Sequence, residues 1–184
     1  GVNPSDVKVR AGGRPGVLKP AFPQIIPQSD GSGVIEAVGD GVEASRVGQK
    51  VWIWNGQWQR AFGTAAEYIA IDAAQAVPMP KRVSFENSAG LGIPGLTAAH
   101  CVFGGGEVAG KTVLVSGGGG TVGFLAVQLA KWGGAKVIAT ASPQDFDRVR
   151  EAGADIVLDY RDENLAPAIL DATDGQGADR AIEP

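Results

Sequence analysis

The residues most suited to chemistry form a glycine-rich stretch in the second half of the chain. Its six residues match the pattern G-x-G-x-x-G: Gly118-Gly119-Gly120-Thr121-Val122-Gly123. Between a strand and a helix, such a loop brings backbone N–H groups against the phosphates of a dinucleotide. Gly118 would permit the tight turn, Gly120 the close approach of a pyrophosphate, and Gly123 the packing of the helix on the strand.

The flanks of this stretch have the patterns that a dinucleotide site requires. Residues 112–115 are β-branched and apolar, as in a buried strand, and the glycines follow directly. Over residues 121–132 apolar side chains recur at helical spacing, until Gly133-Gly134 ends the pattern. Further strands are expected at 137–139, 156–158 and 179–183, with helices at 145–151 and 162–173. This alternation predicts a βαβαβ unit with a parallel sheet, and it indicates that the loop binds a dinucleotide.

A second glycine pattern competes with the first. Residues 105–112 (GGEVAGKT) match G-x-x-x-x-G-K-[ST], the phosphate loop of nucleotide hydrolases. A phosphate loop follows a strand and opens a helix. Here a helical pattern at 98–103 comes before it, and a strand pattern follows Lys111. A P-loop nucleotide hydrolase is therefore a disfavoured alternative.

The residues after the second and third strands bear on which dinucleotide is bound. NAD-dependent enzymes usually carry an acid at the end of the second strand, where it binds the ribose 2′-hydroxyl. In this chain that strand ends at Ser142 without an acid, and a hydroxyl can hydrogen-bond a 2′-phosphate. Tyr160 and Arg161, after the third strand, could add a ring face and a positive charge. The pattern favours NADPH, with Asp145 and Asp147 as nearby charges that oppose a phosphate.

The chain changes character near residue 88. Before it, short β segments alternate with turn dipeptides such as Asp40-Gly41 and Asn55-Gly56. Strands are expected there at 34–38, 51–54, 67–71 and 76–77. We therefore expect two domains, residues 1–88 and residues 89–184, and the second of them holds the glycine loop.

Composition argues against several other classes of protein. The 184 residues carry 16 basic and 20 acidic side chains, and the net charge of −4 argues against nucleic acid or an anionic membrane as a partner. No apolar run approaches the ~20 residues of a membrane span. The single cysteine, Cys101, can form neither an internal disulfide nor a cysteine-rich zinc site. We expect a soluble, cytoplasmic protein.

Four further segments precede the glycine loop in a recognisable order: residues 1–6 (GVNPSD), 27–33 (PQSDGSG), 63–68 (GTAAEY) and 92–98 (GIPGLTA). With the loop, they resemble the zinc-free quinone oxidoreductase and zeta-crystallin branch of the medium-chain dehydrogenase/reductase superfamily. The resemblance covers the whole chain. It implies an α/β protein in which a GroES-like β-barrel domain precedes a Rossmann-type parallel sheet, with the active site in the cleft between them.

The resemblance also implies that this chain is a fragment. The first strands of the barrel and the second half of the Rossmann sheet would then be missing, and Gly1 is not a methionine. Residues 1–184 alone are expected to have weak or no reductase activity. They are also expected to self-associate, because an unpaired strand edge favours association. The full-length protein is expected to be a homodimer.

Zinc-dependent members of the superfamily can be compared position by position. Their metal ligands fall at Asn3, Ser29 and Ile93 of this sequence. Isoleucine cannot bind a metal, and an amide or a hydroxyl is a poor zinc ligand beside a thiolate or an imidazole. The four-cysteine lobe that binds structural zinc is absent. No metal site is therefore expected.

Catalytic residues are suggested by the resemblance alone. Asn3 would lie beside the nicotinamide and the substrate carbonyl as a neutral hydrogen-bond donor, and Thr97 would back the nicotinamide ring. Each also has a purely structural interpretation, as a turn residue before Pro4 and as a helix-start hydroxyl. Trp58 is a candidate aromatic wall for a flat substrate. Lys8 stands where relatives often place a tyrosine, so the proton donor is left open.

The expected function is reduction of a quinone by NADPH without zinc. An NADPH-dependent enoyl or alkenal double-bond reductase is the nearest alternative, since hydride delivery to an activated C=C bond also requires no Lewis acid. A non-catalytic relative, such as a crystallin-like protein that binds NADPH without turnover, is a third reading. The partner is expected to be a small quinone or enone.

Overall fold

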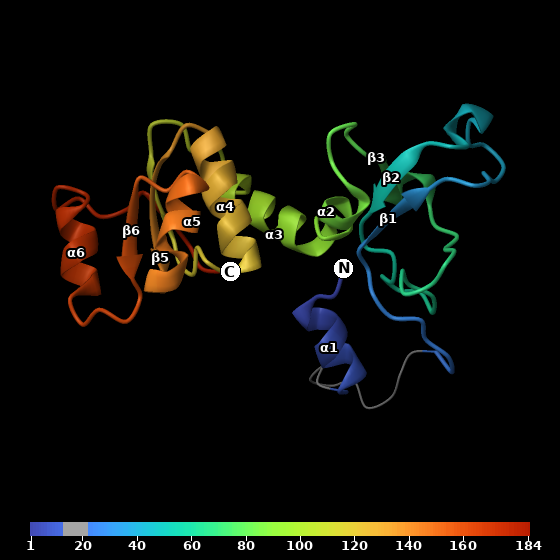
Figure 1. Cartoon of the computed structure of the whole chain (residues 1–184), viewed down its shortest axis with the longest axis horizontal. Helices are drawn as coiled ribbons and strands as arrows, with labels where there is room; N and C mark the ends of the chain where they lie inside the picture. The colour runs from blue at the N-terminus through green and yellow to red at the C-terminus, as the bar shows by residue number, and fades with distance from the viewer. Residues whose placement is uncertain (13–21) are drawn as a thin grey trace. The chain divides into compact units, whose positions relative to one another are not determined.

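The computed structural model describes residues 1–12 and 22–184, which divide into two compact units, Gly1–Ile93 and Pro94–Pro184 (Figure 1). The change in sequence character near residue 88 falls within helix α2, Phe85–Ala89. Within the described parts of the chain, no helix has both the length and the apolar character needed to cross a bilayer.

A three-stranded antiparallel sheet organises the first unit, with the order β1-β2-β3. Its central strand buries Val51 and Ile53 on one face, as two-residue periodicity requires. The strands are β1 (Gly31–Val34), β2 (Lys50–Ile53) and β3 (Ala76–Pro78). The helices are α1 (Pro4–Arg10), α2 and the short 3₁₀ turns η1 (Ala44–Arg46) and η2 (Ala73–Gln75).

The first strand lies earlier in the sequence than expected. The structure places β1 at Gly31–Val34, whereas the sequence pattern predicted a strand at 34–38. The partner strand β2 begins at Lys50, which pairs with Val34. The residues after Ile35 therefore run past the end of their partner, and apolar alternation without a neighbouring strand does not make a ladder.

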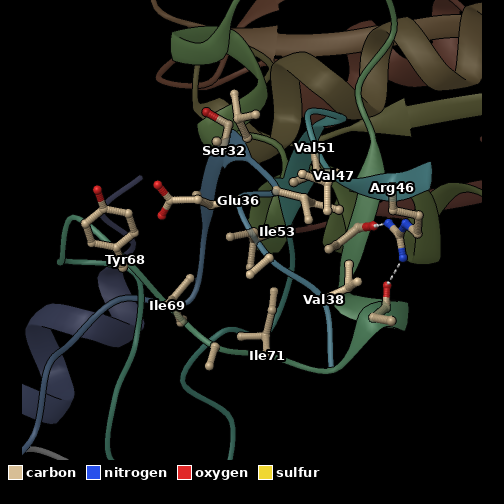
Figure 2. A pocket seen from close by; sticks show the side chains of 18 of the residues that line it. Ser32, Glu36, Val38, Arg46, Val47, Val51, Ile53, Tyr68, Ile69 and Ile71 are labelled. Atoms are coloured by element: carbon tan, nitrogen blue, oxygen red, sulfur yellow. Dashed lines mark hydrogen bonds between the residues drawn. The ribbon is translucent and has the colours of Figure 1, made fainter. Parts of the chain in front are cut away.

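The strand predicted at residues 67–71 is wrong, because no strand of the described residues pairs with this segment. Its alternating apolar side chains serve another purpose. Ile69 and Ile71 line a cavity of about 950 Å³ opposite Val51 and Ile53 of β2 (Figure 2). Apolar periodicity marks a buried face here, and it does not distinguish a paired strand from an extended loop.

Arg46 holds the backbone around this cavity. Its guanidinium donates to the main-chain oxygens of Ala73 and Ala76 (Figure 2). It also donates to the side chain of Gln49. The guanidinium of Arg46 therefore links η1 to η2 and to β3. No predicted site residue is among those that line the cavity.

The second unit is built on a parallel sheet with the order β6-β5-β4-β7, which confirms the predicted alternation of strands and helices. The strands are β4 (Thr112–Val115), β5 (Lys136–Ala141), β6 (Ile156–Asp159) and β7 (Arg180–Ile182). The helices are α3 (Gly92–Phe103), α4 (Thr121–Trp132), α5 (Phe146–Glu151) and α6 (Leu165–Asp171), with the turn η3 (Pro143–Asp145). Figure 1 shows α6 beside the edge strand β6.

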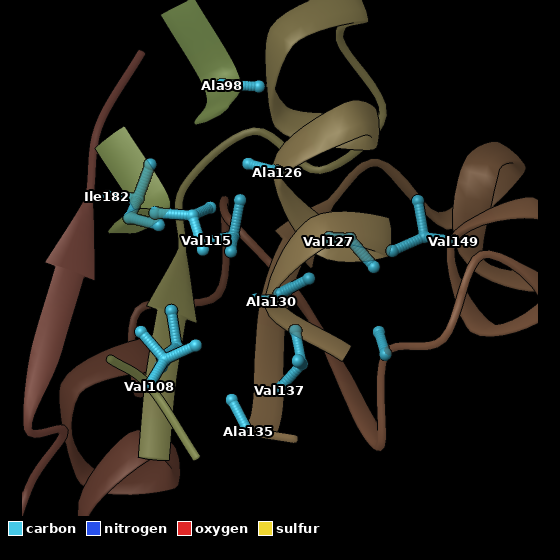
Figure 3. Packing of buried hydrophobic residues seen from close by; sticks show 14 of the residues in the cluster. Ala98, Val108, Val115, Ala126, Val127, Ala130, Ala135, Val137, Val149 and Ile182 are labelled. Atoms are coloured by element: carbon cyan, nitrogen blue, oxygen red, sulfur yellow. The ribbon is translucent and has the colours of Figure 1, made fainter. Parts of the chain in front are cut away.

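Small apolar residues make the core of the second unit. Ala126 and Ala130 of α4 are fully buried against the sheet, where Val115 and Val137 are buried as well (Figure 3). Alanines on the helix let its axis come close to the strands. The start of α4, and with it the glycine loop, is thereby fixed relative to β4 and β5.

Candidate active site

The glycine loop turns between the end of β4 and the start of α4, as the sequence pattern predicted. Its left-handed residue is Gly117, with φ +65°, and Gly118 lies inside the turn that the Gly120 N–H closes onto the Gly117 oxygen at 2.9 Å. Packing gives a further reason for a glycine at position 118. A Cβ there would lie 3.1 Å from the Cβ of Ala139 and 3.2 Å from Cγ1 of Val149, where little room remains.

The last glycine of the pattern allows helix and loop to touch. A Cβ on Gly123 would lie 2.2 Å from the carbonyl oxygen of Gly117, a distance that no real structure tolerates. Gly120, by contrast, has extended dihedral angles, φ −77° and ψ 163°, and a Cβ there would meet only the Gly117 oxygen, at 3.3 Å. No other atom of the described residues outside its immediate chain neighbours lies within 4 Å of that position, which leaves room for a pyrophosphate.

The N-terminus of α4 has no side chain that caps it. Gly120 occupies the N-cap position and offers no acceptor. The first N–H groups of a helix, here those of Thr121, Val122 and Gly123, have no partner within the helix. They carry the positive end of the helix dipole, so the arrangement fits a dinucleotide phosphate.

Thr140 of β5 fixes the loop from the neighbouring strand. This residue is buried, its Oγ1 accepts from the Gly117 N–H at 3.1 Å, and its carbonyl accepts from the Gly118 N–H at 2.7 Å. Thr140 thus binds two successive N–H groups of the turn. The sequence signal for this role is a threonine among the buried apolar residues of β5.

The structure brings the predicted cofactor residues of the second unit to one edge of the sheet. The loop follows β4, Ser142 follows β5, and Tyr160 and Arg161 follow β6. Since β4, β5 and β6 are parallel neighbours, their carboxyl ends meet at this edge. Ligands bind at that edge in open α/β sheets.

Ser142 already has a partner at this edge. Its hydroxyl donates to Oδ2 of Asp145 at 2.8 Å. The carboxylate also lies against the glycine loop, because a Cβ on Gly119 would come within 2.9 Å of the same oxygen. The hydroxyl hydrogen expected to contact a phosphate is therefore directed at an acid.

Arg161 is likewise paired. Its Nε and Nη2 both donate to the carboxylate of Asp159 at 3.1 Å, and its guanidinium lies 5.4 Å from the ring centre of Tyr160. The hydrogen bond from Arg161 holds the pKa of Asp159 below its usual value. The ring of Tyr160 and the guanidinium of Arg161 form one exposed surface, and the carboxylate of Asp159 largely neutralises its positive charge.

Asn3 of the first unit lies in a buried polar cluster. Its side-chain Nδ2 donates to Oδ2 of Asp30 at 2.7 Å, and its backbone N–H donates to Asp6 at 2.7 Å. The Asp30 carboxylate also accepts from the backbone N–H of Ile93, at the start of α3, at 2.9 Å. Burial raises the pKa of Asp30, although these hydrogen bonds oppose the shift. In the sequence Asp30 is only one residue of the segment 27–33, and nothing in its spacing indicates this role.

The remaining predicted residues are exposed. Thr97 lies on α3 beside the buried Ala98, at the sixth position of the helix and not at its start. Trp58 is 59% exposed, in the turn that its N–H closes onto the oxygen of Asn55. The roles predicted for them, Thr97 behind the nicotinamide ring and Trp58 against a flat substrate, stay predictions.

The side chains at the zinc-ligand positions do not fit that metal. Asn3 is an amide bonded to Asp30, Ser29 is a hydroxyl, and Ile93 is apolar. Among residues 1–12 and 22–184, no three His, Cys, Asp or Glu side chains lie close enough to hold an ion. The competing phosphate-loop pattern does not fit its chemistry either, because Lys111 leads into strand β4 and not into a helix.

Comparison with known proteins agrees with this arrangement. Residues 1–81 match the alcohol dehydrogenase GroES-like domain, and residues 121–184 match the zinc-binding dehydrogenase family. A quinone oxidoreductase of Rattus norvegicus is 35% identical over the whole chain and 54% of its own length. A chloroplastic NADPH-dependent alkenal/one oxidoreductase of Arabidopsis thaliana is 35% identical over 89% of this chain and 44% of its own length.

A solved structure shows the same architecture. An alcohol dehydrogenase superfamily protein from Novosphingobium aromaticivorans superposes with a TM-score of 0.88 at 36% identity, over 98% of this chain and 54% of that one. The chain thus spans about half the length of the relatives it matches. Its domains, their order and these relatives establish that the chain belongs to the medium-chain dehydrogenase/reductase superfamily, among the members that resemble quinone oxidoreductases.

Proposed function

We propose that the full-length protein transfers a hydride from NADPH to a quinone without a metal ion. The observation that carries this proposal is the glycine loop, held by Thr140 at the start of an uncapped helix. The loop fits a dinucleotide, and the residues at the zinc positions do not fit zinc. The names of the rat and Arabidopsis relatives support a quinone or an enone as the hydride acceptor and NADPH as the donor.

In this proposal the second unit binds the cofactor. The N–H groups of Thr121, Val122 and Gly123 face the pyrophosphate, while Gly118, Gly119 and Gly120 leave it room. Ser142, Tyr160 and Arg161 surround the adenosine ribose at the carboxyl ends of β5 and β6. When bound, the reduced nicotinamide supplies the hydride, and these residues hold it in place.

The first unit contributes to the substrate side of the proposed reaction. Asn3 donates a hydrogen bond to the carbonyl oxygen on which negative charge develops. Its amide has two N–H groups, and the bond to Asp30 uses one of them. Trp58 offers an aromatic face to a flat quinone, while Thr97, which belongs to the second unit, backs the nicotinamide ring.

A second candidate is reduction of an activated C=C bond in an alkenal or enone. The similarity to the Arabidopsis alkenal/one oxidoreductase favours it, at the same 35% identity as the rat quinone oxidoreductase. Both reactions deliver a hydride and then a proton, and both place negative charge on an oxygen that Asn3 would contact.

One turnover experiment tests the proposal. The full-length protein is mixed with NADPH and offered simple quinones in one series and short enals in another, while NADPH absorbance is followed. Faster oxidation with quinones supports the proposed function, and faster oxidation with enals supports the second candidate. NADPH binding without oxidation in either series would point to the non-catalytic reading.

A further inference from the structure

Gly119, at the middle of the glycine loop, lies between two side chains of opposite charge. The Asp145 carboxylate lies against its Cα side, and Nη1 of Arg148 donates to its carbonyl oxygen at 3.2 Å. Both residues come from the segment that follows β5, where the adenosine ribose of a dinucleotide would lie. Opposite charges at that place would act on the ribose 2′-phosphate, the group that distinguishes NADPH from NADH.

Arg148 has the charge that a phosphate requires. Its guanidinium stacks on the ring of Phe124, 4.1 Å from the ring centre, and is exposed. Within the described part of the chain, no acidic side chain pairs with it. By contrast, Arg161 is paired with Asp159 and Arg150 with Asp147, at 3.1 and 2.9 Å.

Asp145 acts in the opposite direction. Its Oδ2 accepts the Ser142 hydrogen, so the hydroxyl cannot donate to a phosphate unless this bond breaks. A carboxylate beside Gly119 also repels a phosphate dianion, whereas it can accept a hydrogen bond from a ribose hydroxyl. The acid missing from the end of β5 in the sequence is thus supplied by the turn that follows.

On the basis of the proposed function, we propose that Arg148 and Asp145 are opposing determinants of cofactor choice. Arg148 binds the 2′-phosphate of NADPH, and Asp145, with Ser142, favours the free 2′-hydroxyl of NADH. The preference for NADPH is then the difference between two effects, and each can be removed separately.

Calorimetric titration of the full-length protein with NADP⁺ and NAD⁺ separates the two effects without any turnover. Arg148→Met keeps the contact with Phe124 and removes the charge. We expect NADP⁺ to bind about tenfold more weakly, since a charge-assisted hydrogen bond is lost, and NAD⁺ to bind within about twofold of wild type. Asp145→Asn should bind NADP⁺ several-fold more tightly and NAD⁺ more weakly.

Arg150→Met is the matched control, because it is an exposed arginine on the same helix with its own acid partner. It should leave both affinities unchanged. If Arg148→Met weakens both dinucleotides equally, or no more than the control does, the assignment of Arg148 is wrong. A wild-type protein that binds neither dinucleotide would overturn the proposed function itself, which is a different outcome.

Discussion

The side-chain amide of Asn3 is oriented by the carboxylate of Asp30, to which its Nδ2 donates at 2.7 Å, and both residues are buried. An ionised carboxylate can only accept hydrogen bonds, so the NH₂ group of Asn3 must face it and the amide oxygen must face away. The same carboxylate accepts from the Ile93 N–H, which anchors it at the start of α3. In the proposed reaction Asp30 would therefore act through Asn3, as a positioning residue.

Replacing Asp30 by asparagine should impair catalysis through this orientation. An amide at position 30 can both donate and accept, so Asn3 can bind it with either end and its donor is no longer fixed. We expect kcat for the quinone to fall by about tenfold or more, in line with the loss of an oriented donor. NADPH affinity, which we assign to the glycine loop of the second unit, should not change.

Asp6→Asn is the control for this variant. Asp6 also touches Asn3, but it accepts from the backbone N–H, and an asparagine can still accept that bond. Its kcat should stay close to wild type. An equal loss in both variants would show that the Asp30 effect is structural and not an effect on amide orientation.

The buried carboxylate also predicts how stability depends on pH. Burial raises the pKa of Asp30 in the folded protein, so the folded state binds this proton more tightly than the unfolded chain. The stabilisation that comes from binding this proton is fully present below the pKa of Asp30 in the unfolded chain, about 4. It is lost as the pH rises through the pKa of Asp30 in the folded protein. The stability of Asp30→Asn relative to wild type should therefore be greater at pH 7 than at pH 4, as urea denaturation at both values measures. A difference of the opposite sign would contradict this.

The sequence allowed the second unit to be predicted better than the first. The strands β4, β5 and β6 and helix α4 are mainly apolar runs, and α4 lies between Gly120 and Gly133, so local pattern is sufficient for them. In the first unit, whether a segment forms a strand depends on whether a neighbouring strand pairs with it. Residues 67–71 alternate as a strand does, yet no strand of the described residues pairs with them. The length of β1 is likewise set by where β2 begins, which is information from elsewhere in the chain.

The candidate site divides in the same way. The glycine positions follow from a pattern with a fixed physical meaning, although the left-handed residue is Gly117, one position before it. The partners of the site could not be read from spacing. Asp30 reaches Asn3 from 27 residues away, and Arg148 reaches Gly119 from 29 residues away, because folding brings separate loops together.

The chemistry of the zinc positions predicts activity without metal. With an amide at Asn3, a hydroxyl at Ser29 and an alkyl group at Ile93, a zinc ion would lack strong ligands. NADPH oxidation by the full-length protein should persist after dialysis against a chelator. Elemental analysis should find no stoichiometric zinc, and one zinc per chain would show that the site had been assigned to the wrong residues.

Two glycines of the loop should separate cofactor binding from folding. At Gly120 the backbone is extended and a Cβ meets only one atom, at 3.3 Å, so Gly120→Val can fold. Its side chain would enter the space assigned to the pyrophosphate, and NADPH should bind at least about a hundredfold more weakly, a loss of roughly 3 kcal/mol. The melting temperature should stay close to wild type.

At Gly123 the same kind of change should affect the fold first. The Cβ of Gly123→Ala would lie 2.2 Å from the Gly117 carbonyl oxygen, which is backbone and cannot rotate away. Overpacking of this kind costs about 1–3 kcal/mol, which lowers the melting temperature by roughly 4–24 °C for a unit of about 90 residues. Thermal denaturation and fluorescence titration with NADPH, applied to both variants, measure the two effects. Wild-type NADPH affinity in Gly120→Val would mean that the dinucleotide binds elsewhere, whereas wild-type stability in Gly123→Ala would mean that helix and loop do not meet as described.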